Sequence, residues 1–281
     1  MSARITWIHL ALVLLILVLP AAAAAQLVLY DNFNSTRIDP VKWIGVPASV
    51  PGDGDVDRRE VSVGLAGKND SRGLHISQTM YSSTANNTGA GGSGFGLGFA
   101  NARKLTAVSF ALAVNEAQSL GCGANAAFVV AGFSGDFFNP NPSPDGATGD
   151  ITVSIAASRL STDTGTTIEV GGGIAQCDDR KCNSQTSLSF ADLGPVALGS
   201  ANTLAVTWDQ PNHQFIFQLN TNAPVIAGYT VSDAYPPGLD LKSLFVFGSV
   251  PHCTGTPRPY ATMDTLFDNA FVGRTSTWRT R

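Results

Sequence analysis

Apolar and polar residues alternate along most of this chain, whereas the three- and four-residue spacing of an amphipathic helix is almost absent. In the segment GDITVSIAASR (149–159), alternation places three β-branched residues on one side of an extended strand and Asp150, Thr152 and Ser154 on the other. Many such segments, separated by glycine, proline and asparagine, predict an all-β sandwich or barrel. The expected strands lie at 27–33, 59–65, 73–79, 93–100, 104–114, 125–133, 150–158, 166–175, 202–209, 213–220, 223–230, 241–249 and 263–273.

Turn residues mark two hairpins and three long loops. The hairpins are expected to turn at Gln210–His213 and around Asn220–Asn222, where polar residues interrupt the alternation. The loops at 45–57, 81–92 and 134–149 are long for a compact domain, so each is either part of the functional surface or poorly ordered.

The first 25 residues have the features of a secretory signal peptide. A short cationic start, MSAR, precedes a long apolar run and then AAAAAQ, with small residues at Ala23 and Ala25. We expect cleavage after Ala25, a secreted location (extracellular or periplasmic), and no membrane segment in the mature chain. The alternative is an uncleaved membrane anchor, since the apolar run is slightly short of a ~20-residue span.

Charge argues against a nucleic-acid partner. The formal charge is −4, and removal of residues 1–25, which include Arg4 as their charged side chain, changes it to −5. Such a chain lacks the basic field that attracts phosphate backbones. Residues 274–281 form a short basic tail, which is at most a weak patch. The remaining residues, 26–273, are expected to form one domain.

Four cysteines follow the signal segment, which predicts two disulfides in an oxidising compartment. The short loop CDDRKC favours a Cys177–Cys182 pair and leaves Cys122 for Cys253. Sequence alone allows three connectivities. A zinc site is disfavoured, because the chain has no C-x-x-C pair and no histidine cluster near its cysteines.

Four stretches in this order resemble the concanavalin A-like lectin/glucanase superfamily, in particular its laminarinase- and lichenase-type glycoside hydrolases. They are LYDNFNSTRIDPVKWIG (29–45), RREVSVGLAGKNDSRGLHIS (58–77), ANTLAVTWDQPNHQFIFQLNTNAP (201–224) and TLFDNAFVG (265–273). The resemblance covers most of residues 27–273 and implies a two-sheet antiparallel jelly-roll sandwich. Ligands of that family bind across the concave face.

The same resemblance implies a catalytic strand with an E-x-D-x-E triplet. Retaining hydrolysis needs two carboxyl groups about 5 Å apart, which alternate positions of one strand provide. By chain order, the corresponding strand here carries Asp150, Thr152 and Ser154, and a serine hydroxyl is a poor proton donor at neutral pH. We therefore assign no catalytic residue from the sequence, and the incomplete triplet favours a non-catalytic protein over an enzyme.

A structural calcium ion is a further expectation from the resemblance. The family's convex-side site would use the Asp268 carboxylate with the backbone carbonyls of Asn32 and Gly73. The alternative is that Asp268 caps the terminal strands through hydrogen bonds without an ion. The triplet Asp53, Asp55 and Asp57 departs from an EF-hand loop and is interpreted as a solvated acidic turn.

Aromatic side chains are the natural platforms for sugar rings. Trp43 and Trp208 match family positions that are usually packed, so both are expected in the core. Exposed candidates for ligand contact lie in or near the long loops and are Tyr81, Phe137, Phe138, Tyr235 and Tyr260. Adjacent phenylalanines are hard to bury on one strand face; the alternative is that one plugs the end of the sandwich while the other covers the loop.

Three functions remain open from the sequence. The first is a secreted binding module for carbohydrate or a cell-surface polymer. The second is a structural or adhesive extracellular protein, with self-association, and the third is a divergent glycan hydrolase that uses Asp150 and a loop carboxylate. Clustered aromatics beside polar groups on the concave face favour the first, and a small-residue face without a groove favours the second. Suitably spaced carboxyl groups favour the third.

Overall fold

The computed structural model describes residues 26–49, 56–65, 72–82, 89–123, 125–253 and 257–274. Their strands form two antiparallel sheets, as expected for a jelly-roll sandwich. We call the eight-stranded sheet the convex sheet. Its order is β13 (Val225–Gly228), β12 (Gln214–Leu219), β11 (Ala201–Asp209), β6 (Leu105–Leu120), β15 (Tyr260–Arg274), β4 (Arg72–Tyr81) and β3 (Val56–Leu65), with β1 (Val28–Asp31) paired to β15.

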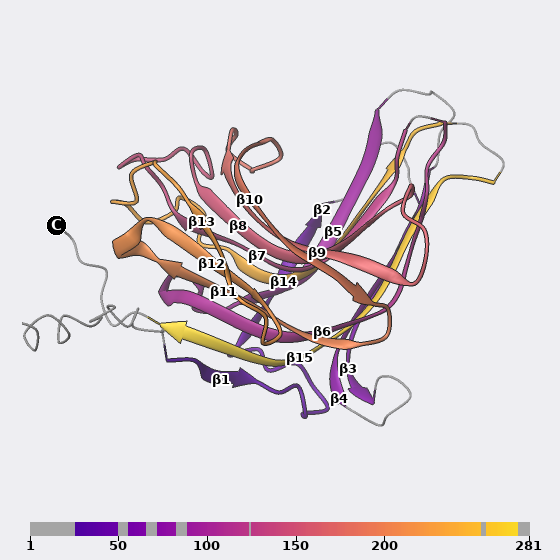
Figure 1. The fold of residues 1–281 in the computed structure, drawn as a ribbon, viewed down its shortest axis with the longest axis horizontal. Helices are drawn as coiled ribbons and strands as arrows, with labels where there is room; N and C mark the ends of the chain where they lie inside the picture. Colours follow the sequence, from indigo (N-terminus) through magenta and orange to yellow (C-terminus); the bar gives the residue numbers. More distant parts are fainter. Residues whose placement is uncertain are drawn as a thin grey trace, which may run out of the picture.

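The seven-stranded sheet, called the concave sheet, lies on the inner side of the curved molecule, and β6 and β15 lie on its outer side (Figure 1). Its order is β10 (Gln185–Ala197), β9 (Thr167–Cys177), β8 (Ile151–Leu160), β7 (Phe128–Phe138), β14 (Lys242–Pro251), β5 (Ala90–Phe99) and β2 (Trp43–Ser49). Short 3₁₀ turns lie at Ala102–Lys104 and Gln210–Asn212.

The core fills the space between the sheets because alternate residues of each strand point inward. On β8, Ile151, Val153 and Ile155 are completely buried, as the alternation predicted. They belong to one hydrophobic cluster with phenylalanines from both sheets, among them Phe110, Phe133, Phe215, Phe217 and Phe267. The expected all-β sandwich is therefore confirmed.

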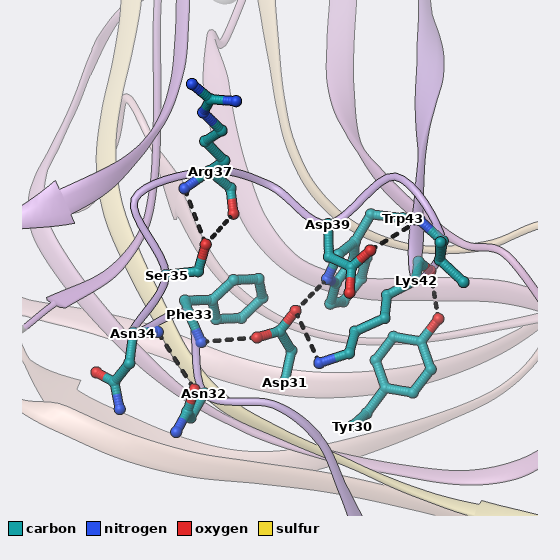
Figure 2. A network of polar contacts seen from close by, with 11 residues as sticks. Tyr30, Asp31, Asn32, Phe33, Asn34, Ser35, Arg37, Asp39, Lys42 and Trp43 are labelled. Carbon is teal, nitrogen blue, oxygen red and sulfur yellow. Dashed lines mark hydrogen bonds and ion pairs between the residues drawn. The ribbon is translucent and has the colours of Figure 1, made fainter.

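A hydrogen-bonded network ties the first strand to the concave sheet (Figure 2). The Asp31 carboxylate accepts hydrogen bonds from the Phe33 backbone at 2.9 Å and from Trp43 Nε1 at 2.8 Å, and Lys42 Nζ lies 3.7 Å away. Tyr30 donates its hydroxyl to the Lys42 carbonyl. Trp43 and Trp208 are both buried, so their predicted place in the core is confirmed.

Both expected hairpins and both expected disulfides are present. β11 turns into β12 through Gln210–Asn212, and β12 pairs with β13 after Asn220. Cys122–Cys253 joins the end of β6 to the segment after β14, and Cys177–Cys182 joins β9 to the approach to β10.

Several strands differ from the expectation. β2 and β10 were not expected, and β2 occupies the start of the loop predicted at 45–57. β7 continues to Phe138, into the loop predicted at 134–149. The proposed signal peptide (1–25), the turn aspartates Asp53 and Asp55, and residues 275–281 of the tail lie outside the described residues. Within the described ranges, no helix has the length and apolar character needed to cross a bilayer.

Candidate functional site: a trough on the concave face

The outward face of the concave sheet carries a shallow trough with a floor of small residues. Two adjoining hollows, of about 250 Å³ and about 420 Å³, lie along it and share Ser154, Gly173 and Phe190. We define the trough by the outward-facing residues of β7, β8 and β9 that line these hollows: Val130, Ser134, Thr152, Ser154, Ala156, Ser158, Gly171, Gly173 and Ala175.

Strand register explains why the floor is low. Gly132, Ala156 and Gly171 lie opposite one another on β7, β8 and β9, and Asp192 of β10 continues the row. In the next row, Ser134 pairs with Ser154, and Ser154 pairs with Gly173 of β9. Because residues directly opposite in an antiparallel sheet share a face, these small side chains together leave open space above the sheet.

Phe190 of β10 forms one wall of the trough. Its ring covers Gly171, since a Cβ atom added there would lie 2.7 Å from the ring. The side chain is nevertheless 70% exposed, the largest fraction among the exposed aromatic residues of the described chain. The glycine lets the ring lie close to the sheet; a side chain at this position would displace the ring. An exposed aromatic face beside a hollow is the usual form of a sugar-stacking platform.

A second aromatic group lies on the other side of the trough. Phe247 of β14 lies over Gly92 and Gly94, where an added Cβ atom would come within 2.8 Å and 2.7 Å of its ring. Phe128 of β7 packs against Phe247 with ring centroids 5.8 Å apart. Val130 lies between Phe247 and the floor in the register. Phe128 and Phe247 therefore lie on the same sheet face beyond Val130, outside the residues that line the two hollows.

Hydroxyl groups line both hollows. Ser134, Thr152 and Ser154 line the smaller hollow, and Ser158 lines the larger one. Their side chains make no hydrogen bond to any other part of the described chain. Thr152 as a whole residue is 7% exposed, and its hydroxyl is not among the buried unpaired side-chain atoms of the described residues. Hydroxyl groups that have no protein partner and line a hollow can hydrogen-bond to water or to a polar ligand.

Charge is confined to one end of the trough. Glu169 and Asp192 line the larger hollow, and among the described residues no lysine or arginine lines either hollow. The Asp192 Oδ1 atom accepts a hydrogen bond from the Gly194 backbone at 2.9 Å. This end is therefore negative.

The opposite end is covered by the segment before β14. Asp150 continues the outward-facing series of β8, but its carboxylate is completely buried. It accepts hydrogen bonds from Asn139 Nδ2 at 2.6 Å, the Gly238 backbone at 2.6 Å and the Leu239 backbone at 2.8 Å. The divergent hydrolase left open by the sequence would use Asp150, but this carboxylate is enclosed and holds a covering loop in position.

Two further charged groups are buried beside Asp150. Burial, and then the nearby Asp150 carboxylate, raise the pKa of Asp136 to about 7. Burial lowers the pKa of Lys242, which the neighbouring carboxylates partly offset. The Lys242 Nζ atom donates to the Asp136 carbonyl at 2.5 Å and lies over the Phe137 ring. These contacts fasten the end of β7 to the start of β14.

Two of the five predicted ligand residues are core residues. Phe137 and Phe138 are 1% and 0% exposed, and Phe138 stacks on Trp208 with ring centroids 5.4 Å apart. The register of β7 with β8 shifts between Asp136 and Phe138, so one extra residue turns Phe138 inward, opposite Ile151. Both candidates are thus corrected, because a β-bulge lets adjacent side chains enter the core.

The other three predicted ligand residues lie away from the trough. Tyr81 and Tyr260 are opposite one another on β4 and β15 of the convex sheet, with ring centroids 6.2 Å apart. Arg258 lies over the Tyr81 ring. Tyr235 belongs to the covering segment, where it forms an isolated β-bridge with Asn139. The structure therefore brings together one pair of the predicted set and leaves Tyr235 apart from it.

The expected calcium ligands meet at an irregularity of β15. Its register shifts between Asp268 and Phe271, Asn32 follows the Asp31–Ala270 pair, and Gly73 lies beside the Phe267 carbonyl. Both Asp268 carboxylate oxygens accept hydrogen bonds from Asn269, and burial raises the pKa of Asp268.

Calcium prefers six to eight oxygen ligands, and this place supplies one carboxylate that is already bonded. Across the described ranges, no group of three or more histidine, cysteine, aspartate or glutamate residues is placed to hold a metal ion. The calcium site that the resemblance implies stays a prediction, and the observed hydrogen bonds of Asp268 are with its neighbour Asn269.

The residues that sequence reasoning missed are Phe128, Phe247, Phe190, Glu169 and Asp192. Phe190 and Asp192 were missed because β10 was not expected. Alternating glycines at 92, 94, 96 and 98 of β5 were a usable signal, since bare positions on one strand face indicate a close approach by other side chains.

No protein-family model matches this chain, and no curated protein matches it in sequence. Among solved structures, it is similar to an endo-glucanase of glycoside hydrolase family 16 from Bacteroides ovatus (13% identity over 86% of this chain and 97% of that chain, TM-score 0.43). It is also similar to the alginate lyase from Klebsiella pneumoniae (10%, 76% and 84%, TM-score 0.41). A third is lectin II from Ulex europaeus (13%, 82% and 97%, TM-score 0.33).

At these identities and TM-scores, the likenesses transfer no residue role or activity to this chain. The fold itself is given by the sheet order: two antiparallel sheets packed as a jelly-roll sandwich.

Proposed function

We propose that this protein is a secreted, non-catalytic carbohydrate-binding module and that the trough is its binding surface. The observation that carries the proposal is the combination of the exposed Phe190 ring with the row of unpaired hydroxyls at Ser134, Thr152 and Ser154. A pyranose offers an apolar C–H face to a ring and hydroxyls to polar groups, so both features match a glycan chain.

Secretion is part of the same proposal. The two disulfides are of the kind that persist in oxidising compartments, and the first 25 residues have the pattern of a cleaved signal. The partner would then be an extracellular carbohydrate or cell-surface polymer, not a nucleic acid or a membrane.

The test compares two exposed aromatic residues on opposite faces. In calorimetric titrations with oligosaccharides selected on a glycan array, Phe190→Ala should weaken binding at least about tenfold, as expected for an aromatic anchor. Tyr81→Ala, on the convex sheet, should leave the affinity unchanged. Loss of binding in Tyr81→Ala alone would move the site to the convex face and contradict the proposal.

One observation favours glycan hydrolysis as a second candidate function: the residues Glu169 and Asp192 line the same hollow. Hydrolysis needs such a pair as acid and as base or nucleophile. Release of reducing ends from a bound oligosaccharide, abolished by Glu169→Gln, would replace the non-catalytic proposal. Glycan-independent self-association, seen by size-exclusion chromatography and lost in Phe190→Ala, would instead favour the adhesive alternative.

A further inference from the structure

The two hollows of the trough follow one another along strand β8. Thr152 lines the smaller hollow, Ser158 lines the larger one, and Ser154 between them lines both. Phe190 of β10 also lines both hollows, so its ring borders the trough along one side. A chain-like ligand that fills both hollows therefore runs parallel to β8, and the two ends of this strand decide how far it can extend.

The trough is closed at one end of β8 and open at the other. Asp150, the outward-facing residue before Thr152, is completely buried, whereas Leu160 at the far end of the strand is 47% exposed. Strand β9 shows the same contrast. Cys177, which donates its backbone N–H to the Asp150 carbonyl at 2.9 Å, is buried, and Glu169 at the other end of β9 is exposed. The outer face of the sheet is thus covered on one side of the hollows and accessible on the other.

Three segments that pack on one another form the closed end, and we call them the end wall. They are residues 139–149, 178–184 and 235–240. The Gly238 backbone passes so close to the Gly146 carbonyl oxygen that an added Cβ atom would lie 1.9 Å from it. The Ala147 backbone N–H donates to the Arg180 carbonyl at 2.9 Å, which joins the first segment to the second. Segments in such close backbone contact present a continuous barrier to a ligand.

Buried hydrogen bonds keep the end wall in place. Asn139, which is completely buried, donates its side-chain amide to the Asp150 carboxylate at 2.6 Å and to the Thr148 carbonyl at 3.0 Å. Its backbone N–H donates to the Tyr235 carbonyl at 3.0 Å. The Asp150 carboxylate also accepts a hydrogen bond from the Gly238 backbone. Because breaking hydrogen bonds to a buried carboxylate costs free energy, the wall resists displacement by a ligand.

We propose that the trough binds a linear glycan by one chain end: the terminal sugar lies over Thr152 against the end wall, and the chain leaves along β8 past Glu169. This inference rests on the proposed function. A chain bound at an internal sugar would have to continue through the end wall, whereas a terminal sugar can abut it, so the wall excludes internal sugars by steric clash. The ligand class is therefore an oligosaccharide or polysaccharide with accessible, unbranched ends.

Calorimetric titrations test this with different forms of one sugar. The probe is the linear hexasaccharide that binds most tightly on the glycan array, used untagged, with a bulky non-aromatic tag on its reducing end, and with the same tag on its non-reducing end. One of the two tags should weaken binding at least about tenfold, because it collides with the end wall, and the other should change the affinity less than about twofold. A long unbranched polymer of the same sugar should bind one protein molecule per chain.

Asp150→Asn connects this effect to the end wall. It weakens the hydrogen bonds that hold residues 235–240, so the loss of affinity caused by the obstructive tag should shrink to less than about threefold. The matched control is Asp31→Asn, because Asp31 is likewise a buried carboxylate that accepts two hydrogen bonds, but lies on β1 of the convex sheet. This control should keep the full tenfold loss.

Thermal unfolding checks that both variants fold, and if Asp150→Asn does not, the tagged probes and the polymer decide alone. A folded Asp150→Asn variant that keeps the full loss would show that the tag collides elsewhere, and would overturn the role of the end wall.

Two results separate this inference from the function on which it rests. Tags that leave the affinity unchanged on either end, or several protein molecules bound per polymer chain, would overturn chain-end binding and leave the carbohydrate proposal intact. Failure to bind any arrayed glycan would overturn the proposed function itself.

Discussion

The two faces of the concave sheet use aromatic rings in opposite ways. On the inner face, Phe137 and Phe138 fill the space beneath Trp208 and are almost fully enclosed. On the outer face, Phe190 lies on a glycine and keeps most of its surface open. The face of the sheet, rather than closeness to a long loop, decides whether a ring stabilises the fold or is available to a ligand.

The largest expected difference between the two faces is in how much removing a ring lowers the free energy of unfolding. Phe138→Ala should lower the free energy of unfolding by about 3–5 kcal/mol, because it leaves a cavity in a packed cluster. Phe190→Ala should change it by less than about 0.5 kcal/mol, as for an exposed residue. Chemical denaturation of both variants measures this; comparable losses would mean that Phe190 is part of the core.

Two neighbouring glycines of β9 allow the core face and the trough face of the sheet to be compared directly. A Cβ atom at Gly172 would lie 2.3 Å from the Phe217 ring, whereas one at Gly173 would meet nothing closer than Ser154 Oγ at 3.6 Å. Gly172→Val should therefore destabilise the protein by about 1–3 kcal/mol through overpacking.

Gly173→Val should fold normally and abolish glycan binding by filling the trough, and thermal unfolding with calorimetric titration would measure both effects. Glycan binding that survives in a folded Gly173→Val variant would place the ligand elsewhere.

The pH dependence of stability tests the buried Asp136, which lies where the segment before β14 covers the end of the trough. Its pKa is raised from 3.8 to about 7 in the folded protein, so between these values the folded state keeps a proton that the unfolded state has released. The contribution of this group to stability therefore falls as the pH rises toward 7, by on the order of 1 kcal/mol or more.

Asp136→Asn should flatten this part of the pH profile of unfolding. Asp145→Asn, which changes an exposed aspartate paired with Arg180, is the control and should keep the wild-type slope. An unchanged slope in Asp136→Asn would show that this carboxyl is ionised in the folded state throughout the range.

Most strands and both hairpins followed from alternation and turn chemistry, the cysteine pairs from the short CDDRKC loop, and the buried tryptophans from the family resemblance. β10 did not, because its pattern is irregular: Leu188 and Phe190 are exposed, Gly194 and Pro195 interrupt the strand, and its register to β9 shifts twice. Edge strands often have such features, which avoid unwanted pairing and weaken the sequence signal.

The candidate site was harder to predict for the same physical reason. Its most exposed ring is on β10, and the β-bulge that buries Phe138 depends on pairing with β8, which the local sequence does not specify. The trough floor depends on register across three strands. Each of these is a long-range property, whereas sequence patterns report local preferences.

The position of Phe190 at the margin of its sheet has a mechanical consequence. β10 ends the concave sheet and pairs along one side with β9, whereas the floor strands β8 and β9 are held on both sides. Marginal strands open at lower free energy than central ones, so the wall bearing the ring can yield while the floor stays fixed. A movable β10 would let the trough accommodate ligands of differing width. Amide hydrogen exchange in β10 should then slow when a ligand binds.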